Sequence, residues 1–196
     1  AVSAFTQSRV IYTISSRVRT GEIAMDLIKP ISFFKYVFAL NSGQNAFGIV
    51  FRALPLILIF VPLYHIAVPD AGHFLVFLIS VFNAMLIRYL ITYALGLTGF
   101  WAVKIWHLDF LFSIMMDIFA GSVVPLWFFP AVFVRVSDFL PFKFIHFVPL
   151  SIYLQKLTMQ ESLLSLVYQF LWIGALFALG RLVWVRGIKK LVLQGG

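Results

Sequence analysis

The chain has 196 residues, of which 62% are hydrophobic and only 11% are charged. A soluble domain usually carries about 25% charged residues, so this composition excludes an ordinary water-soluble globule and favours a protein embedded in lipid. The net charge of +8 indicates basic loops held on the cytoplasmic side of a membrane, and no nucleic-acid partner is expected. The chain has no Cys, which excludes disulfides and thiolate metal sites.

Long apolar segments follow one another along the chain, each close to the roughly 20 residues that a spanning helix needs. Their expected bounds are 52–68, 74–98, 109–128 and 162–182. An opening segment at 2–18 is also apolar but contains Arg9, and we interpret it as the end of a further span. The segments do not alternate as barrel strands would. The sequence therefore predicts an all-α, polytopic membrane protein with a single transmembrane domain over 1–196.

The basic residues predict how the spans are oriented. If the segment 17–35 is cytoplasmic, alternation of the spans places Lys104 and the C-terminal tail on the same side. The inside set is then Arg17, Arg19, Lys29, Lys35, Lys104, Arg181, Arg186, Lys189 and Lys190. The outside set is Arg135, Lys143 and Lys156. This bias favours a cytoplasmic location for both the 17–35 segment and the tail.

The segment 128–160 is interrupted by Pro130, Pro141 and Pro149, and each proline disfavours a helical residue before it. Short apolar pieces between prolines suit re-entrant half-helices that dip into the membrane before the last span. Broken backbone at that depth must be buried in protein or line a water-filled cavity. The alternative is an external loop lying on the lipid surface. The Thr-x-x-Glu sequence at 158–161 has the spacing of a capping box and predicts the start of the last helix.

Arg88 is the most informative charge, because it lies roughly 15 Å from the cytoplasmic end of its span, too deep to reach water easily. Small or polar residues recur at every fourth position here, which is typical of a helix-packing face in membranes: Ser80, Ala84, Arg88, Thr92 and Gly96. Asp117 in the next span has a comparable depth. We predict a buried Arg88–Asp117 pair, which either only holds helices together or lies in a substrate pathway. A weaker small-residue step from Gly174 to Ala178 predicts packing on the last helix.

His65 and Asp70 form the pattern His-x-x-x-x-Asp, which some acyltransferases use with His as the base and Asp orienting it. The pair falls in a short external turn without a glycine-rich or basic phosphate-binding stretch, so a structural role is the stronger interpretation. With His73 nearby, the turn is also weak evidence for a metal site. No Walker loop, Gly-x-Gly-x-x-Gly or Gly-x-Ser-x-Gly motif occurs. Work that uses a nucleotide would therefore need another chain to bind it.

Several short motifs resemble one known family in their order and spacing. They are Gly21-Glu22-Ile23-Ala24, Asp26-Leu27-Ile28-Lys29-Pro30, Gly121-Ser122-Val123-Val124-Pro125-Leu126, Phe129-Pro130, Leu140-Pro141-Phe142, Arg186-Gly187-Ile188-Lys189-Lys190 and Gln194-Gly195-Gly196. Together they resemble the permease subunits of type-2 ATP-binding-cassette (ABC) exporters, in particular a bacterial branch long described only as a family of unknown function. The resemblance covers nearly the whole chain.

The resemblance implies six spanning helices, a cytoplasmic coupling helix between the second and third, and re-entrant half-helices before the last span. We find four full spans and one partial one, so the first helix and part of the second are expected to be missing from this chain. The segment 21–32 is the expected coupling segment that docks on an ATPase subunit. Its named residues are Gly21, Glu22, Ile23, Met25, Asp26, Leu27 and Lys29, with Pro30 ending the short helix. The alternative is an amphipathic helix resting on the bilayer surface.

The resemblance implies the transmembrane subunit of an ATP-driven exporter in the bacterial cytoplasmic membrane. ATP and Mg²⁺ would bind to separate ATPase subunits, with no cofactor and no catalytic site in this chain. A second permease chain, identical or homologous, is expected to complete the pathway. Aromatic and apolar walls favour an amphipathic or hydrophobic cargo such as a drug, lipid or organic cation. The alternatives are an acyltransferase-like membrane enzyme built around His65 and Asp70, and a secondary transporter that uses Arg88 and Asp117.

Overall fold

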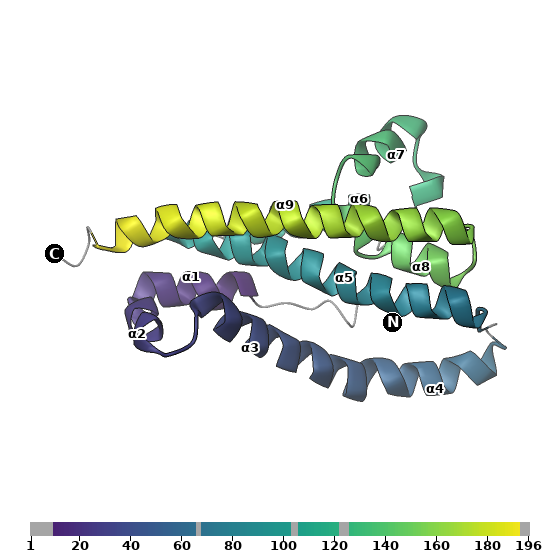
Figure 1. The fold of residues 1–196 in the computed structure, drawn as a ribbon, viewed down its shortest axis with the longest axis horizontal. Coiled ribbons are helices and arrows are strands. Elements are labelled where there is room, and N and C mark those ends of the chain that lie inside the picture. The colour runs from purple at the N-terminus through teal and green to yellow at the C-terminus, as the bar shows by residue number, and fades with distance from the viewer. Residues whose placement is uncertain (1–9, 66–67, 103–105, 122–125, 193–196) are drawn as a thin grey trace.

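The computed structural model describes residues 10–65, 68–102, 106–121 and 126–192, and its regular elements are all helical. Figure 1 shows long helices lying roughly side by side, with short helices at both ends. The long elements are α3 (Phe33–Gly48) continuing into α4 (Leu54–Leu63), α5 (Ala71–Leu97) and α9 (Met159–Val192). Within the described residues, three helices are long and apolar enough to cross a membrane: Phe33–Leu63, Ala71–Phe100 and Met159–Lys190. The expected all-helical, multi-pass architecture is confirmed.

The span predicted at 52–68 begins much earlier than expected. Helix α3 leads through a π-helical turn at Ile49–Ala53 into α4, and together they form one helix of 31 residues. Its first half was missed because Asn41 and Asn45 interrupt the apolar run, yet both side chains are buried in the protein. No residue of α4 is buried. A helix whose side chains are apolar on every side and exposed is suited to contact with lipid.

The span predicted at 109–128 is wrong in its length. Helix α6 (Trp106–Phe119) has only 14 residues. At 1.5 Å per residue it is roughly 21 Å long, which is less than the hydrocarbon thickness of a bilayer. Gly121 follows with φ 65°, a left-handed conformation that glycine adopts without steric penalty and that turns the chain off the helix axis. Residues 122–125 of the predicted span lie outside the described residues.

Helix α5 is the centre of the fold. Helix α9 lies along most of its length, and α1 (Val10–Thr20) packs against its C-terminal half. The predicted packing face is confirmed, because four of its members are buried: Ser80, Ala84, Thr92 and Gly96. Helix α1 approaches so closely that a Cβ atom on Gly96 would lie 2.9 Å from Cβ of Ile14. The opening segment predicted at 2–18 therefore contributes a packed helix, and its residues 1–9 lie outside the described part.

The second small-residue step does not behave as predicted. Gly174 and Ala178 are both exposed on the outer side of α9, and a Cβ atom on Gly174 would have no neighbour within 4 Å. Small residues permit close helix contact only where another helix is present. Among the residues that the structure describes, no second helix covers this position.

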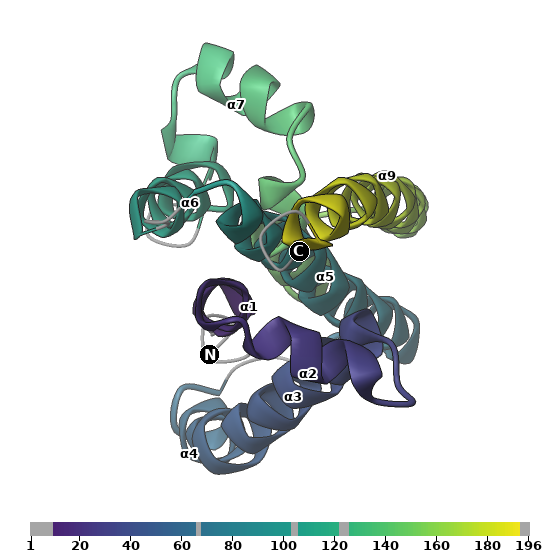
Figure 2. The ribbon, with the colours of Figure 1, turned by 90° about the vertical axis from the view of Figure 1, so that its left-hand side faces the viewer.

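The proline-rich segment forms short helices at the end of the bundle where α5 begins. They are α7 (Ala131–Asp138) and α8 (Phe147–Tyr153), with a 3₁₀ turn at Phe142–Phe144 between them. Pro130 and Pro141 directly precede α7 and the turn. Helix α8 packs against α5 and buries most of its residues, whereas α7 stands away from the bundle and is mostly exposed (Figures 1 and 2).

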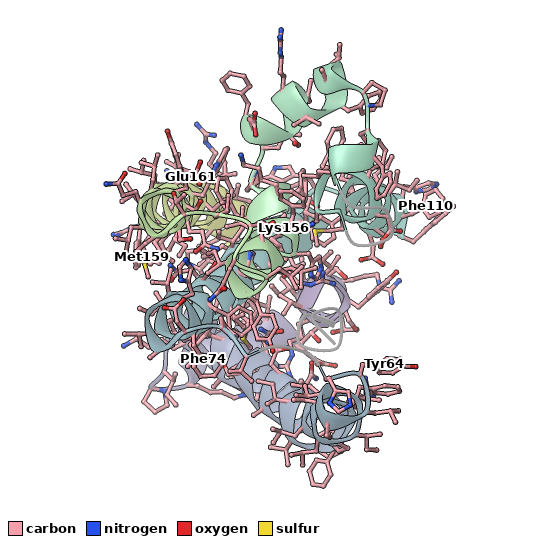
Figure 3. The ribbon with its side chains drawn as sticks, turned by 90° about the vertical axis from the view of Figure 1, so that its right-hand side faces the viewer. Tyr64, Phe74, Phe110, Lys156, Met159 and Glu161 are labelled. Carbon is pink, nitrogen blue, oxygen red and sulfur yellow. The ribbon has the colours of Figure 1, made fainter. Side chains whose placement is uncertain are left out.

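The predicted capping box at the start of α9 is confirmed. The backbone N–H and the hydroxyl of Thr158 both donate to Glu161 Oε2 at 2.8 Å, and the backbone N–H of Glu161 donates to Thr158 Oγ1 at 3.3 Å. These reciprocal bonds satisfy donors that the first turn of a helix leaves free. Figure 3 looks onto this end of the bundle, where Met159 and Glu161 begin α9 and Phe74 lies in the first turn of α5.

The two predicted sets of basic residues lie at opposite ends of the bundle. Helix α2 (Glu22–Ile28) and its flanking Arg17, Arg19, Lys29 and Lys35 lie at the same end as the last turns of α9, which carry the C-terminal cluster (Figure 1). Of the outside set, Arg135 lies in α7, Lys143 in the 3₁₀ turn before α8, and Lys156 after α8. We call the first end the α2 end. Its cytoplasmic location stays a prediction, and Lys104 lies outside the described residues.

A buried side-chain amide connects α9, α5 and the turn before α8 in the half of the bundle opposite the α2 end. The side-chain amide of Gln169 on α9 is fully buried and donates to the backbone carbonyl of Ser80 at 3.1 Å, to its hydroxyl at 3.0 Å and to the carbonyl of Phe144 at 3.0 Å. Asn83 donates to Gln169 Oε1 at 3.4 Å. One side chain on α9 thus joins α5 and the turn before α8 by hydrogen bonds in an apolar setting.

Replacing Gln169 with Leu is expected to lower the free energy of unfolding by about 1 kcal/mol, because buried acceptors on Ser80 and Phe144 lose their donor. The measurement is unfolding in mixed micelles of increasing denaturing-detergent fraction. Gln160 is exposed on the same helix, so Gln160→Leu is the matched control and should leave the midpoint unchanged. An equal shift in both variants would contradict the role given to the amide.

Candidate functional site

Helix α2 is the part of the expected coupling segment that is folded as a helix. It follows Gly21, whose φ of 77° is left-handed and lets the chain reverse direction after α1. The helix ends at Ile28 because Lys29 has extended backbone angles, φ −66° and ψ 144°. A residue before proline avoids the helical region, so Pro30 ends the helix as predicted. The sequence thus folds into a short helix with sharp breaks on both sides.

A cluster of four side chains, the α2 clamp, holds this helix in place: Arg17, Asp26, Lys29 and Tyr36. The Asp26 side chain is only 2% exposed and forms ion pairs with Arg17 of α1 and with Lys29, whose Nζ lies 2.6 Å from Oδ1. Arg17 also donates to the Tyr36 hydroxyl of α3 at 2.9 Å. The clamp therefore joins α1, α2 and α3 at a single buried carboxylate.

The Tyr36 ring adds a second contact to the two cations of the clamp. The guanidinium carbon of Arg17 lies 5.0 Å from the ring centroid and Lys29 Nζ lies 4.5 Å from it. Both distances are within the range of an attractive cation–π interaction. The aromatic face therefore helps to keep two like charges together around one carboxylate.

The clamp also sets the ionisation of its acid. Burial by itself raises the pKa of the Asp26 carboxyl, but hydrogen bonds from Lys29 and Arg17 outweigh it and hold the pKa below its usual value. The carboxylate is therefore charged at neutral pH and keeps both of its partners.

The docking of α2 is expected to be independent of pH in the neutral range and to loosen only in acid. A carboxyl with a lowered pKa stabilises the fold fully above its ordinary pKa of about 3.9, and this stabilisation is lost as the pH falls through the lowered value. Amide hydrogen exchange of residues 22–28 between pH 7 and pH 3, corrected for intrinsic rates, measures this. A loosening that is complete by pH 6 would contradict the assignment of the clamp to Asp26.

The predicted docking residues divide into two groups. Ile23 is fully buried and Asp26 nearly so, which means that they hold α2 to the protein and do not meet a partner directly. The outer side of the segment is apolar, because Met25 is 68% exposed, Ile28 78% and Ile31 55%. Glu22 is exposed and Leu27 is 42% exposed. The sequence did not indicate Arg17 and Tyr36 as clamp residues, since neither lies within a helical turn of Asp26.

Arg88 lies on α5 opposite α6, as the predicted pair requires. It is partly buried, its Nε atom is shut off from solvent and makes no hydrogen bond with the described residues, and its guanidinium lies 5.7 Å from the Phe112 ring centroid. Asp109 and Asp117 both attract it electrostatically. The ion pairs within 4 Å between described residues do not include Arg88 with Asp117. Whether the two pair directly stays a prediction.

Asp70 has a structural task at the start of α5. Its carboxylate accepts hydrogen bonds from the backbone N–H groups of Gly72 and His73 at 3.1 Å, and from the Gln155 amide at 2.7 Å. It also lies 2.6 Å from His73 Nδ1. The backbone and side-chain bonds with His73 lower the pKa of the Asp70 carboxyl. His65 is not among these partners, so the Asp70 bonds explain the turn without acyltransferase chemistry.

The metal site weakly suggested by His73 is likewise not formed. The part of the chain that the structure describes contains no group of three His, Asp or Glu side chains arranged to hold a metal ion. Asp70 and His73 therefore serve as a helix cap.

Comparison with known protein families decides between the alternatives. The model of the ABC-2 family transporter proteins matches residues 1–195, which is nearly the whole chain. The chain belongs to the ABC-2 transporter family. No curated protein and no solved structure matches it. The resemblance found in the sequence is thereby confirmed, and this ABC-2 protein is the membrane component of an ABC transporter, a class that works with ATPase subunits. Neither the acyltransferase nor the secondary transporter gains support.

Proposed function

We propose that this ABC-2 protein is the permease subunit of an ATP-driven exporter, and that α2 transmits the motion of separate ATPase subunits to its spanning helices. The observation that carries the proposal is the α2 clamp. A coupling element must be stiff, and Asp26 is bound on two sides by Arg17 and Lys29. It must also offer a surface to a partner, and Met25 and Ile28 are largely exposed. Exposed apolar residues on a short, fixed helix are suited to protein docking.

The path from α2 into the membrane follows named contacts. Arg17 connects α2 to α1. Helix α1 packs tightly where Gly96 of α5 and Gly99 of the 3₁₀ turn that follows it allow close approach. Tyr36 connects the same clamp to α3, which continues into the first long span. A displacement of α2 would therefore act on two spanning helices at once, which supports a role in coupling.

The protein would lie in a bacterial cytoplasmic membrane with its α2 end inside, and ATP and Mg²⁺ would bind to the ATPase subunits. A second permease chain, identical or homologous, would complete a pathway for a drug, lipid or organic cation. Arg88 and Asp117 would lie along that pathway or brace it. We also propose that α8 is a re-entrant half-helix, supported by its burial against α5.

The test is to replace Met25 and Ile28 together with Asp in the complete transporter. Loss of copurification with the ATPase subunit is expected, because charges on the apolar face must be desolvated at the interface. Phe139 is 81% exposed at the opposite end, so Phe139→Asp is the matched control and should keep the ATPase bound. Full retention of the ATPase by the double variant would refute the docking role of α2.

A further inference from the structure

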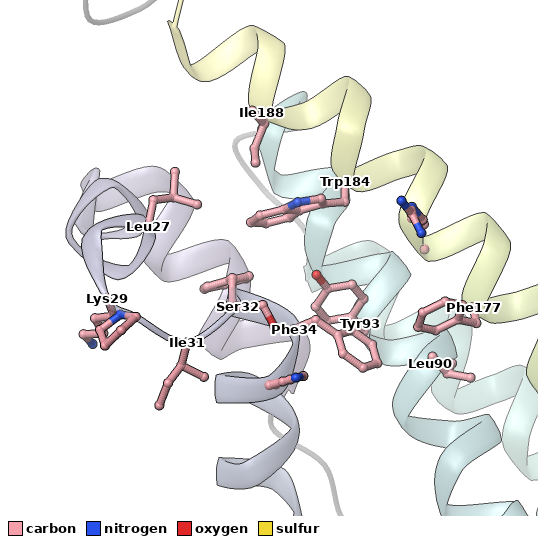
Figure 4. Close-up of a pocket in the computed structure, with 15 residues that line it drawn as sticks. Leu27, Lys29, Ile31, Ser32, Phe34, Leu90, Tyr93, Phe177, Trp184 and Ile188 are labelled. Carbon is pink, nitrogen blue, oxygen red and sulfur yellow. The ribbon is translucent and has the colours of Figure 1, made fainter.

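A half-open groove lies beside α2, between the link to α3 and the paired helices α5 and α9 (Figure 4). Its volume is about 690 Å³, which is within the range of roughly 300 to 1,000 Å³ typical of small-molecule sites. Leu27 lines it from α2, whereas Met25 and Ile28 do not. The groove therefore shares Leu27 and Ile31 with the coupling segment but leaves out Met25 and Ile28, the two residues proposed to meet the ATPase.

The charged side chains that line the groove are all positive. Its lining residues include three cations, Lys29, Lys35 and Arg181, and no acid. Lys29 is already engaged by Asp26. Lys35 and Arg181 are exposed, and within the described residues neither takes part in a salt bridge or hydrogen bond. Two cations that line one groove from two different helices, α3 and α9, and have no anionic partner among the described residues form a site complementary to a phosphate or carboxylate.

Aromatic side chains line the same groove. Phe34 on α3 meets Tyr93 on α5 and Phe177 on α9 edge to face, with ring centroids 5.1 and 5.6 Å apart. Trp184 closes the groove towards the end of α9, where it stacks on Phe33 at 5.1 Å. These rings form an apolar wall made by α3, α5 and α9 (Figure 4).

The position of the groove along α9 fits the edge of a bilayer. Residues 162–180 of α9 carry no charge, and Arg181 is the first basic residue beyond them. Tyr and Trp gather at the level of lipid headgroups, where Tyr93 and Trp184 line the groove. A ligand held here would have its charged part in the headgroup region and its apolar part in the hydrocarbon.

We propose that the groove binds one anionic phospholipid as a resident ligand, with its phosphate held between Lys35 and Arg181 and its acyl chains along Phe34 and Phe177. This lipid would connect the α2–α3 link to α5 and α9, and so would brace the segment beside the α2 clamp. The proposal goes beyond the transport function, because the lipid is retained and not exported. The cations of the groove match the anionic headgroup of such a lipid, its aromatic lining matches the acyl chains, and its position along α9 matches the headgroup level of a bilayer.

The experiment compares lipid retention by the purified transporter in nanodiscs that contain phosphatidylglycerol and phosphatidylcholine with identical acyl chains. Native mass spectrometry after release from the nanodisc counts the lipids that stay bound. We expect selective retention of phosphatidylglycerol. In the Lys35→Gln, Arg181→Gln variant this retention should fall by about tenfold or more, because each cation near an anionic lipid strengthens its binding by roughly fivefold. Arg186→Gln with Lys189→Gln removes two charges outside the groove lining and should keep the selectivity.

A second readout places the lipid in the groove. With Trp184 as the single tryptophan, brominated phosphatidylglycerol should quench its fluorescence more strongly than brominated phosphatidylcholine, and the difference should vanish in the Lys35→Gln, Arg181→Gln background. Equal retention of both lipids, or equal loss of selectivity in the two double variants, would overturn the proposal. Displacement of the bound lipid by added ATPase subunit would also overturn it and would assign the groove to the ATPase. Retention unchanged by ATP hydrolysis is expected for a resident lipid.

Discussion

Asp26→Ala is expected to reduce transport by the complete transporter about tenfold or more while its ATPase subunits continue to hydrolyse ATP. The substitution removes the carboxylate that Arg17 and Lys29 share and leaves a partly buried Arg17 without its anion. Losing a charged hydrogen-bond partner in such a setting costs about 2 kcal/mol, which corresponds to more than a tenfold change in the population of docked α2. Transport and ATP hydrolysis are measured in parallel in proteoliposomes.

The control for this prediction is an acid in an exposed ion pair. Asp138 lies 2.6 Å from Lys143 Nζ at the opposite end of the bundle, and its side chain is 52% exposed. Exposed pairs contribute little, so Asp138→Ala should leave coupling unchanged. Exchanging the charges, with Arg17→Asp and Asp26→Arg in one chain, should recover part of the transport. Equal coupling in Asp26→Ala and Asp138→Ala would show that the clamp is not needed.

Gly96→Leu is expected to have the largest effect on folding, lowering the free energy of unfolding by about 3 kcal/mol. Even a Cβ atom at this position would lie 2.9 Å from Cβ of Ile14 and 3.3 Å from the backbone Cα of Ile11. These atoms cannot rotate away, so α1 would have to move off α5 and would carry α2 with it. The yield of monodisperse protein and the midpoint of thermal unfolding in detergent measure the change.

The matched control is Gly174→Leu on α9, where a Cβ atom would meet nothing within 4 Å. The same side chain is added to a helical glycine of a spanning segment, so any general effect of leucine is removed from the comparison. We expect its midpoint to equal that of the unchanged protein. A similar loss in both variants would mean that close packing at Gly96 does not limit stability.

The sequence located two of the long helices. Helices α5 and α9 lie where the apolar runs indicated, and the Thr158–Glu161 box begins α9 as predicted. The first long span was underestimated, because Asn41 and Asn45 are polar in the sequence but buried in the protein. Helix α6 was overestimated, because an uncharged run alone does not reveal that Gly121 leaves the helical conformation. Hydropathy therefore indicates whether a segment lies in lipid more accurately than it indicates where the helix begins and ends.

The short helix of the candidate site was predicted, but the contacts that hold it were not. The segment 21–32 forms a short helix ended by Pro30, as expected, yet Asp26 and Ile23 face the protein. Nothing in the pattern separates an acid that meets a partner chain from one that binds Arg17, since the pairing depends on how α1 returns to α2 after Gly21. The groove could not be predicted at all, because Lys35, Tyr93 and Arg181 come together only through the packing of three separate helices.

The π-helical turn at Ile49–Ala53 has a consequence for the long helix that contains it. Such a turn carries one residue more than an α-helical turn, and each residue advances a helix by roughly 100°. The side chains of α4 are therefore rotated relative to those of α3, and the buried stripe from Phe33 to Gly48 ends at Ala53. Deleting one residue within 49–53 would let this turn close as an ordinary α-helix and would keep the same side chains of α4 facing the same surroundings. Deleting a residue within α4 itself would instead turn every later side chain of that helix by roughly 100°.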